Sequence, residues 1–328
     1  MGVSTDPGLA PASSGPSEVR WLPARLQTAQ ALRRLALASV IANVVIVVTG
    51  GAVRLTDSGL GCPTWPRCTD KSLTPTSASA LHGIIEFTNR QLTFVLVIIA
   101  VATWTVAMVR RTERRTATVA ALSIPAQAVL GGLTVLTHLN PWLVAAHFML
   151  SMAIIAVTFV LWWRVRGLRE DGTVERLVVD PRARLIAWFT AGATLATLVI
   201  GTVVTGSGPH AGDLTHGRIR RTGLQPSSVA QLHADAVMVL IGLTVGLLVL
   251  VYAVRAAEQL RRAAVILLVV ELAQGVIGYT QYFLHLPELL VGFHMLGACL
   301  VWLAALNVVV RTEPAAVPAR VEPLRRSG

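Results

Sequence analysis

Long apolar segments dominate this chain, and short polar segments separate them. An α-helix needs about 20 apolar residues to cross the ~30 Å hydrocarbon core of a bilayer. Backbone groups in lipid must find hydrogen-bond partners within the spanning segment, which favours helices. The pattern therefore predicts an all-α integral membrane protein with eight transmembrane helices. The expected spans are 33–54, 80–109, 116–137, 142–163, 183–206, 229–254, 260–283 and 288–310.

Composition supports this class. Hydrophobic residues make up 54% of the 328 residues and charged residues only 14%, and the mean hydropathy is +0.64. Soluble globular proteins carry far more charge. The chain is too apolar for a soluble domain.

Basic residues account for the net charge of +11, and their placement indicates topology. Arginines cluster at both ends of the chain and in alternate connections, for example at 110–115 and 164–184. By the positive-inside rule, both termini are expected to be cytoplasmic and the protein to lie in the cell membrane. The basic excess suits contact with anionic membrane lipid, and we expect no nucleic-acid partner.

Two segments of the chain, residues 127–147 and 274–294, are similar in sequence and align with each other without a gap. The aligned pairs include Gln127 and Gln274, Gly131 and Gly278, His138 and His285, and His147 and His294. This repeat predicts two duplicated four-helix bundles.

The repeat also suggests a division of the chain. Residues 33–166 form the N-terminal half and 183–311 the C-terminal half, joined by a cytoplasmic linker at 167–182. The polar ends, 1–32 and 312–328, are expected to be disordered cytoplasmic tails.

Four histidines fall near the predicted outer ends of the even-numbered helices: His82, His147, His233 and His294. Helical rise places them within roughly 5–10 Å of the outer boundary. Histidine at membrane depth is costly and usually functional. Two opposed imidazoles suit a six-coordinate haem iron, so we pair His82 with His147 and His233 with His294. The alternative is a set of hydrogen-bonded histidines near the headgroups.

Glu86 and Arg90 lie one helical turn apart in the predicted second span. A lone carboxylate there is expensive and should face the bundle interior. Two interpretations remain open, an internal ion pair that fixes helix packing and an acid that handles protons or orients a substrate.

Cys62 and Cys68 lie in the first long outer loop, close to Pro63, Trp65 and Pro66. That loop faces an oxidising compartment, where a disulfide can persist. A structural staple, a redox-active pair, and metal binding or free thiols are the alternatives.

These motifs carry a family resemblance. The runs TGGAVRLTDSGLGCPTWPRC (49–68), IEFTNR (85–90) and GGLTVLTHLNPWLVAAHF (131–148), with the later histidines, resemble the heme A synthase family over about residues 33–310. The resemblance implies eight helices in two halves and oxidation of the C8 methyl of haem O to the formyl group of haem A, for cytochrome oxidase biogenesis. It places a haem b cofactor in the C-terminal half and the substrate haem in the N-terminal half.

The resemblance also implies residue roles. His233 and His294 would ligate the iron of haem b, and His147 would face the substrate iron. Glu86 matches the carboxylate important for activity, with Arg90 beside it. The cysteine pair of the outer loop matches a pair found in many members.

One position departs from the family pattern. Helix 2 of the family carries a histidine three residues after the glutamate, and this chain has Asn89 there. Asparagine is a poor haem ligand. Either His82 substitutes for it, or His147 alone holds the substrate haem and leaves an open axial position.

The implied partners are the haem O substrate, an electron donor that the residues do not identify, haem O synthase and oxidase assembly factors. The competing function is an electron-transfer cytochrome with two bis-histidine b haems and no haem modification. Such a carrier has no need of Glu86 and would release no haem A.

Overall fold

The computed structural model describes residues 23–75, 80–167, 180–210, 212 and 221–313. Within these ranges, eight long helices and one short 3₁₀ turn, η1 (Ala24–Leu26), form, and there is no strand. The helices are α1 (Ala29–Leu55), α2 (Ala80–Val109), α3 (Arg114–Leu136), α4 (Pro141–Arg166), α5 (Pro181–Ser207), α6 (Pro226–Ala253), α7 (Glu258–Phe283) and α8 (Glu288–Thr312). All eight are long and apolar enough to cross a membrane. The prediction of an all-helical, multi-pass membrane protein is confirmed.

Polar caps decide where several helices begin. Thr28 Oγ1 accepts a hydrogen bond from the Ala31 amide at 3.1 Å, and Asn140 Oδ1 accepts from the Trp142 amide at 3.0 Å. Such caps satisfy amides that the first turn leaves without partners. Because of the Thr28 cap, residues 29–32 belong to the first helix rather than to the N-terminal tail. The rest of that tail up to residue 22, residues 168–179 of the linker, and 314–328 lie outside the described residues.

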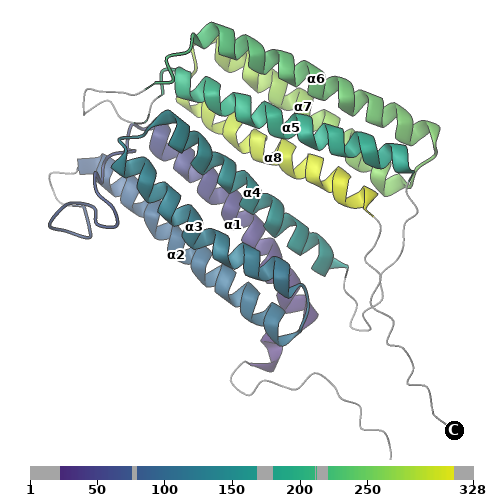
Figure 1. The fold of residues 1–328 in the computed structure, drawn as a ribbon, viewed down its shortest axis with the longest axis horizontal. Helices are drawn as coiled ribbons and strands as arrows, with labels where there is room; N and C mark the ends of the chain where they lie inside the picture. Colours follow the sequence, from purple (N-terminus) through teal and green to yellow (C-terminus); the bar gives the residue numbers. More distant parts are fainter. Residues whose placement is uncertain (1–22, 76–79, 168–179, 211, 213–220, 314–328) are drawn as a thin grey trace, which may run out of the picture.

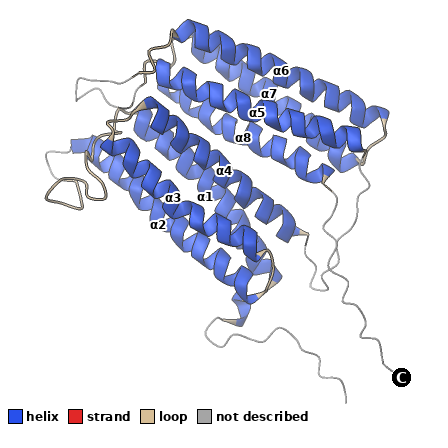
Figure 2. Cartoon of the chain, viewed as in Figure 1, coloured by secondary structure: helices blue, strands red, loops and turns tan. Residues whose placement is uncertain are grey.

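The helices form two groups of four, α1–α4 and α5–α8 (Figures 1 and 2). In each group, consecutive helices contact each other and the first packs against the fourth. Short connections between antiparallel neighbours are typical of such bundles. Both groups therefore have the same neighbour order.

A buried seam between α1, α4, α5 and α8 joins the two groups. Trp302 of α8 donates its indole N–H to the Met152 carbonyl of α4 at 2.9 Å. The buried side chains of this seam are Val40, Val47, Met152, Ile155, Phe159, Leu198, Cys299, Trp302 and Leu306. Cys299 is a packing residue here, with its thiol fully buried.

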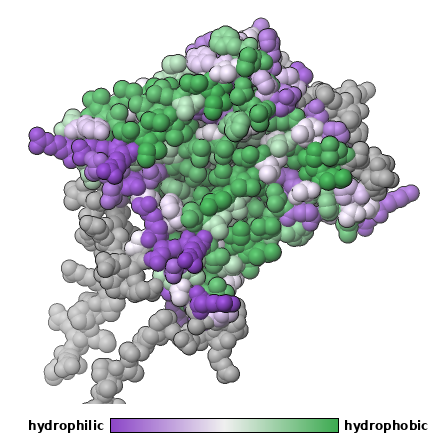
Figure 3. Space-filling view, turned by 180° about the vertical axis from the view of Figure 1, so that it is seen from behind, coloured by the Kyte–Doolittle hydropathy of each residue, from purple (hydrophilic) through white to green (hydrophobic). Residues whose placement is uncertain are grey.

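Apolar side chains also cover the outside of the bundles. Figure 3 shows a broad hydrophobic surface over the helices on the face in view, with hydrophilic residues gathered mainly towards the helix ends. Among the exposed apolar side chains of the bundles are Ile98 of α2 and Val249 of α6, with 68% and 65% of their surface exposed. Lipid tails are as apolar as these side chains, so this surface suits a bilayer.

The two short turns α3–α4 and α7–α8 have the same backbone form. His138 and Leu139 have φ of 52° and 55°, and His285 and Leu286 have φ of 61° and 63°. In both turns the leucine amide donates to a carbonyl five residues back, from Leu139 to Thr134 and from Leu286 to Gln281. His138 and His285 are exposed turn residues.

Replacing Trp302 with alanine should lower the free energy of unfolding by about 3–5 kcal/mol, because it opens a cavity between the bundles. It also leaves the Met152 carbonyl without its donor. Thermal unfolding of the purified protein in detergent measures the effect. Trp142→Ala is the control, since Trp142 is 55% exposed, and it should change stability by less than about 0.5 kcal/mol. Equal losses in the two variants would contradict a structural role for the seam.

Candidate paired-histidine site

His233 of α6 and His294 of α8 face each other near the outer ends of their helices. Their ring centroids are 6.4 Å apart, and the ring planes are inclined at 73°. An imidazole nitrogen binds a metal at about 2.0–2.1 Å and its ring centroid lies roughly 1 Å further away, so rings on opposite sides of one ion have centroids about 6 Å apart. The observed spacing fits two axial ligands of one metal ion.

The rest of a coordination shell would have to come from outside the described residues. The described residues contain no group of three or more His, Cys, Asp or Glu side chains that could hold a metal ion. The Nδ1 atoms of both rings are buried without a hydrogen-bond partner. A macrocycle that supplies four equatorial nitrogens fits a site with only two protein ligands.

Glycines on the neighbouring helices bring backbone against these rings. A Cβ placed on Gly201 of α5 would lie 3.2 Å from Cε1 of His233, and one on Gly278 of α7 would lie 3.2 Å from Cε1 of His294. Such contacts are tighter than side chains normally make, so only glycine lets the helices approach this closely. The glycines hold the imidazoles edge-on.

A glutamine side chain donates a hydrogen bond to the backbone carbonyl of each histidine in the repeat, His147 and His294. Gln274 Nε2 donates to the His294 carbonyl at 2.6 Å, and Gln127 Nε2 donates to the His147 carbonyl at 2.9 Å. The alignment of Gln127 with Gln274 was visible in the sequence, but their partners were not. Gly297 makes room for the Gln274 side chain, since a Cβ there would lie 1.8 Å from Gln274 Oε1.

His147 of α4 occupies the matching place in the N-terminal bundle. A Cβ on Gly131 of α3 would lie 2.9 Å from its Cε1, and its Nδ1 is buried without a partner. Gln127 also donates to Ser151 Oγ at 2.6 Å. His147 therefore has the same glycine and glutamine neighbours as His294.

Asn89 of α2 lies beside a glycine at the corresponding depth of α1, but at an ordinary van der Waals distance. A Cβ on Gly50 of α1 would lie 3.8 Å from Asn89 Nδ2, and the Thr49 hydroxyl donates to Asn89 Oδ1 at 2.8 Å. All four glycines lie at a similar distance from the ends of their helices. The distance is five residues for Gly50, Gly131 and Gly278 and six for Gly201. Asn89 thus stands where the other three positions hold histidine.

His82 lies elsewhere. It is seven residues before Asn89, about 10 Å nearer the outer end of α2, and its Nδ1 is 3.0 Å from Ser58 Oγ in the outer loop. Among the described residues, no ring contact joins it to His147. The pairing of His82 with His147 stays a prediction that these contacts do not support.

Glu86 and Arg90 clamp the first outer loop onto α2. Glu86 is 5% exposed. One of its oxygens accepts from the Arg90 guanidinium, with Nε at 3.1 Å, and the other accepts from the Cys62 amide at 2.7 Å. Arg90 also donates to the Cys62 carbonyl at 2.8 Å and to the Thr64 carbonyl at 3.0 Å. The internal ion pair is confirmed, and a role for Glu86 in proton transfer stays a prediction.

Cys62 and Cys68 form a disulfide, with Cα atoms 4.3 Å apart, and both side chains are buried. Trp65 of the same ring packs over Gly132 of α3, where a Cβ would lie 2.5 Å from the indole. The loop is therefore anchored to α2 by hydrogen bonds and to α3 by the tryptophan. The bond is present in the structure, and its role as a structural staple or as a redox-active pair stays a prediction.

The end of α1 and the first outer loop are also tied to the connection between α5 and α6. Arg54 Nε donates to the His210 carbonyl at 2.7 Å, and the Gly59 amide donates to the Gly212 carbonyl at 2.8 Å. The His210 ring in turn lies 2.8 Å from the Leu286 carbonyl in the α7–α8 turn. Sequence reasoning found no role for His210, because these partners are distant in the chain.

Two other acidic residues differ in their surroundings. Glu271 of α7 is 3% exposed and accepts from the Thr244 hydroxyl of α6 at 2.9 Å, which suits a structural role. Asp235 of α6 is exposed and accepts from Gln231. Asp235 is therefore not a buried counterpart of Glu86.

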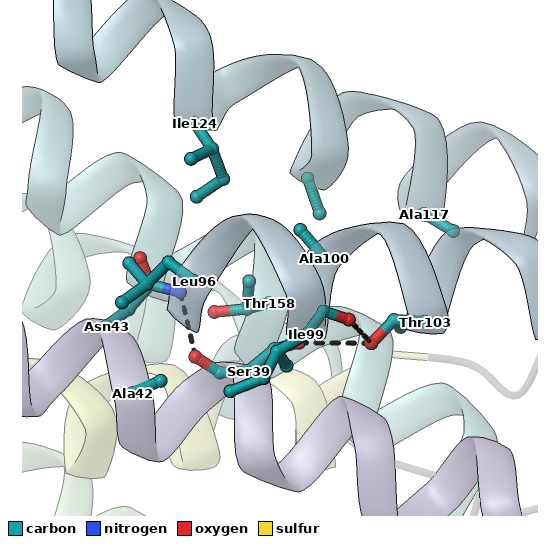
Figure 4. A pocket seen from close by; sticks show the side chains of 11 residues that line it. Ser39, Ala42, Asn43, Leu96, Ile99, Ala100, Thr103, Ala117, Ile124 and Thr158 are labelled. Atoms are coloured by element: carbon teal, nitrogen blue, oxygen red, sulfur yellow. Dashed lines mark hydrogen bonds between the residues drawn. The ribbon is translucent and has the colours of Figure 1, made fainter. Parts of the chain in front are cut away.

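A small cavity of about 10 Å³ lies deeper in the N-terminal bundle, between α1, α2, α3 and α4 (Figure 4). Ser39 and Thr103 share a hydrogen bond of 3.2 Å on its wall, and Asn43 Nδ2 donates to the Ser39 carbonyl. A space of this size holds about one water molecule. It is too small for a cofactor.

The fold and the site define a multi-pass membrane protein with a paired-imidazole site near one end of a four-helix bundle. Residues 33–306 match the family of cytochrome oxidase assembly proteins, and the chain belongs to that family.

Similar curated proteins are named heme A synthase. The protein of Geobacillus thermodenitrificans is 30% identical over 169 residues, which is 50% of this chain and 52% of the relative. That of Exiguobacterium sp. is 32% identical over 168 residues, again 50% and 52% of the two chains. That of Lysinibacillus sphaericus is 28% identical over 181 residues, 54% and 57%. The alignments span about half the length of these relatives.

Replacing Arg90 with alanine should loosen the outer loop, because it removes hydrogen bonds worth about 1.5–3 kcal/mol each from a charged donor. The disulfide should then be reduced by a water-soluble thiol at least about tenfold faster, since 1.4 kcal/mol corresponds to a factor of ten. Alkylation of the released thiols, followed by mass spectrometry, measures the rate. Arg67→Ala is the matched control, because the Arg67 side chain is exposed; similar acceleration in both variants would count against the clamp.

Proposed function

We propose that this chain oxidises the C8 methyl group of haem O to the formyl group of haem A in the membrane, for cytochrome oxidase biogenesis. Its family membership and the names of similar proteins support the reaction. The observation that carries the proposal is the opposed His233–His294 pair, with ring centroids 6.4 Å apart. Because the described part of the bundle adds no further ligands, the pair suits haem.

The C-terminal bundle would hold a haem b cofactor. His233 and His294 would ligate its iron, Gly201 and Gly278 lie against the imidazole rings, and Gln274 fixes the α8 backbone at His294. Haem bound in this way supplies one-electron transfer. Haem bound there would lie near the seam through which α1 and α4 of the N-terminal bundle contact α8.

The N-terminal bundle would bind the substrate haem. His147 is the ligand to its iron, since it has the same glycine and glutamine neighbours as His294. Asn89 lies on the matching face of α2. This arrangement supports binding of the substrate iron by His147 alone rather than by His147 with His82.

Glu86 is the proposed catalytic carboxylate of this half. It lies three residues before Asn89, so the two share a face of α2. Its carboxylate is therefore at the outer side of the substrate site and is held by Arg90 and Cys62. In this position it can orient the substrate and hold or release a proton at Oε1 or Oε2.

The remaining assignments rest on topology and chemistry. Arginine-rich connections place both termini in the cytoplasm and the disulfide loop outside. The reaction needs an electron donor, and the Cys62–Cys68 pair is a candidate relay to it. Haem O synthase and oxidase assembly factors are proposed partners, since haem O and haem A must be received and passed on.

Pigment analysis tests the proposed function. Membranes of a host that makes haem O, with and without this chain, are extracted and their haems separated and weighed by mass spectrometry. We expect haem A or its hydroxylated intermediate only with the chain. Purified protein that carries haem b and leaves haem O unchanged would instead establish an electron-transfer cytochrome.

Replacing Gly278 with valine should displace the His294 ring and reduce haem b content at least about tenfold, because the added side chain occupies the space of the imidazole. Gly275→Val is the matched control on the same helix, since a Cβ there meets nothing within 4 Å. The absorbance of haem b relative to protein, in samples with equal thermal stability, reports the result. Equal haem b content in the two variants would remove His294 from the site.

A further inference from the structure

Three histidines and Asn89 lie beside glycines at similar depths of the helices, and they divide into two pairs, one in each bundle. In the C-terminal bundle both members are histidines, and their rings face each other. In the N-terminal bundle the members are His147, beside Gly131, and Asn89, beside Gly50. The helices of both bundles have the same neighbour order. By analogy with the C-terminal bundle, we assign the position opposite His147 to the carboxamide of Asn89.

The Asn89 side chain is oriented by its neighbours. Oδ1 accepts the hydrogen bond from the Thr49 hydroxyl at 2.8 Å, and that hydroxyl is also 3.1 Å from the Val45 carbonyl of its own helix. Asn89 Nδ2 has no hydrogen-bond partner among the described residues. A carboxamide nitrogen carries two N–H donors and no acceptor. The side chain thus presents N–H groups, not a metal-binding lone pair.

We infer that the substrate iron bound by His147 keeps an open axial position, and that Asn89 Nδ2 donates a hydrogen bond to a small ligand bound there. The inference rests on the proposed function. The ligand class is a diatomic molecule or anion whose outer atom accepts a hydrogen bond, as dioxygen and cyanide do. Asn89 is a positioning residue for that ligand, and Thr49 holds its amide in place.

The experiment uses the full chain loaded with haem O in the ferric state and cyanide as the probe. Absorption and electron paramagnetic resonance spectra report the spin state of each iron, and cyanide titration reports the open position. The unaltered chain should show a high-spin substrate iron that binds cyanide, beside a low-spin haem b that does not. The haem b spectrum of each variant verifies that the protein is folded.

Three substitutions separate the contributions. Asn89→His should supply a second imidazole, convert the substrate iron to low spin and weaken cyanide binding at least about a hundredfold. Asn89→Val should keep the high-spin state but weaken cyanide binding about fivefold to tenfold, the effect of one lost hydrogen bond. Thr49→Val should weaken it less than Asn89→Val does. Thr202→Val is its matched control, because that hydroxyl bonds the carbonyl of Val199 on its own helix.

Several outcomes would overturn the inference. One is a low-spin substrate iron in the unaltered chain that becomes high-spin in His82→Ala, which would make His82 the second ligand. Another is cyanide affinity in Asn89→Val equal to that of the unaltered chain. If haem A forms while these spectroscopic results fail, only the role of Asn89 falls. If the chain neither retains haem O nor forms haem A, the proposed function is wrong, and so is the inference that rests on it.

Discussion

Close contact between a glycine of one helix and a ring or amide of the next organises the outer half of this protein. Lipid tails are as apolar as leucine, so helices in a bilayer gain little from burying leucine and associate through close packing and hydrogen bonds. Gly131, Gly201 and Gly278 let backbone approach imidazole edges, and Gln127 and Gln274 add hydrogen bonds to histidine carbonyls. Each polar group is thereby held at a set depth and rotation, which any two-sided ligand site requires.

The two bundles share these packing contacts but carry different side chains at the matched positions. In the C-terminal bundle, two histidines close the site from both sides, which suits a group that stays bound. In the N-terminal bundle, Asn89 replaces one imidazole, and the outer loop is fastened over α2 by Glu86 and Arg90. The disulfide stiffens that loop, and Arg54 ties it to the other bundle. Under the proposed function, the C-terminal bundle would keep a permanent cofactor and the N-terminal bundle would bind a substrate that must enter and leave, which would account for the difference.

Sequence patterns predicted much of this arrangement. The spans followed from hydropathy, and the repeat at 127–147 and 274–294 correctly singled out His147 and His294 as matched positions. The partners of Gln127 and Gln274 were not predicted, although their alignment was visible. His82 was included because it lies near the end of an even-numbered helix, as the other three histidines do. In the structure it lies about two turns from Asn89, and its ring contacts Ser58 in the loop.

The sequence by itself determined that the chain crosses a membrane eight times, that its helices divide into two groups, and which residue types lie near the outer ends. Apolar run length and the one-dimensional repeat carry that information, because each depends on neighbours along the chain. Only the tertiary structure decided that Glu86 clamps the cysteine loop, that His233 faces His294, and that His82 contacts Ser58 in the loop while Asn89 lies beside Gly50. Those relations depend on how each helix is rotated and on which surfaces touch, and packing between distant segments sets both.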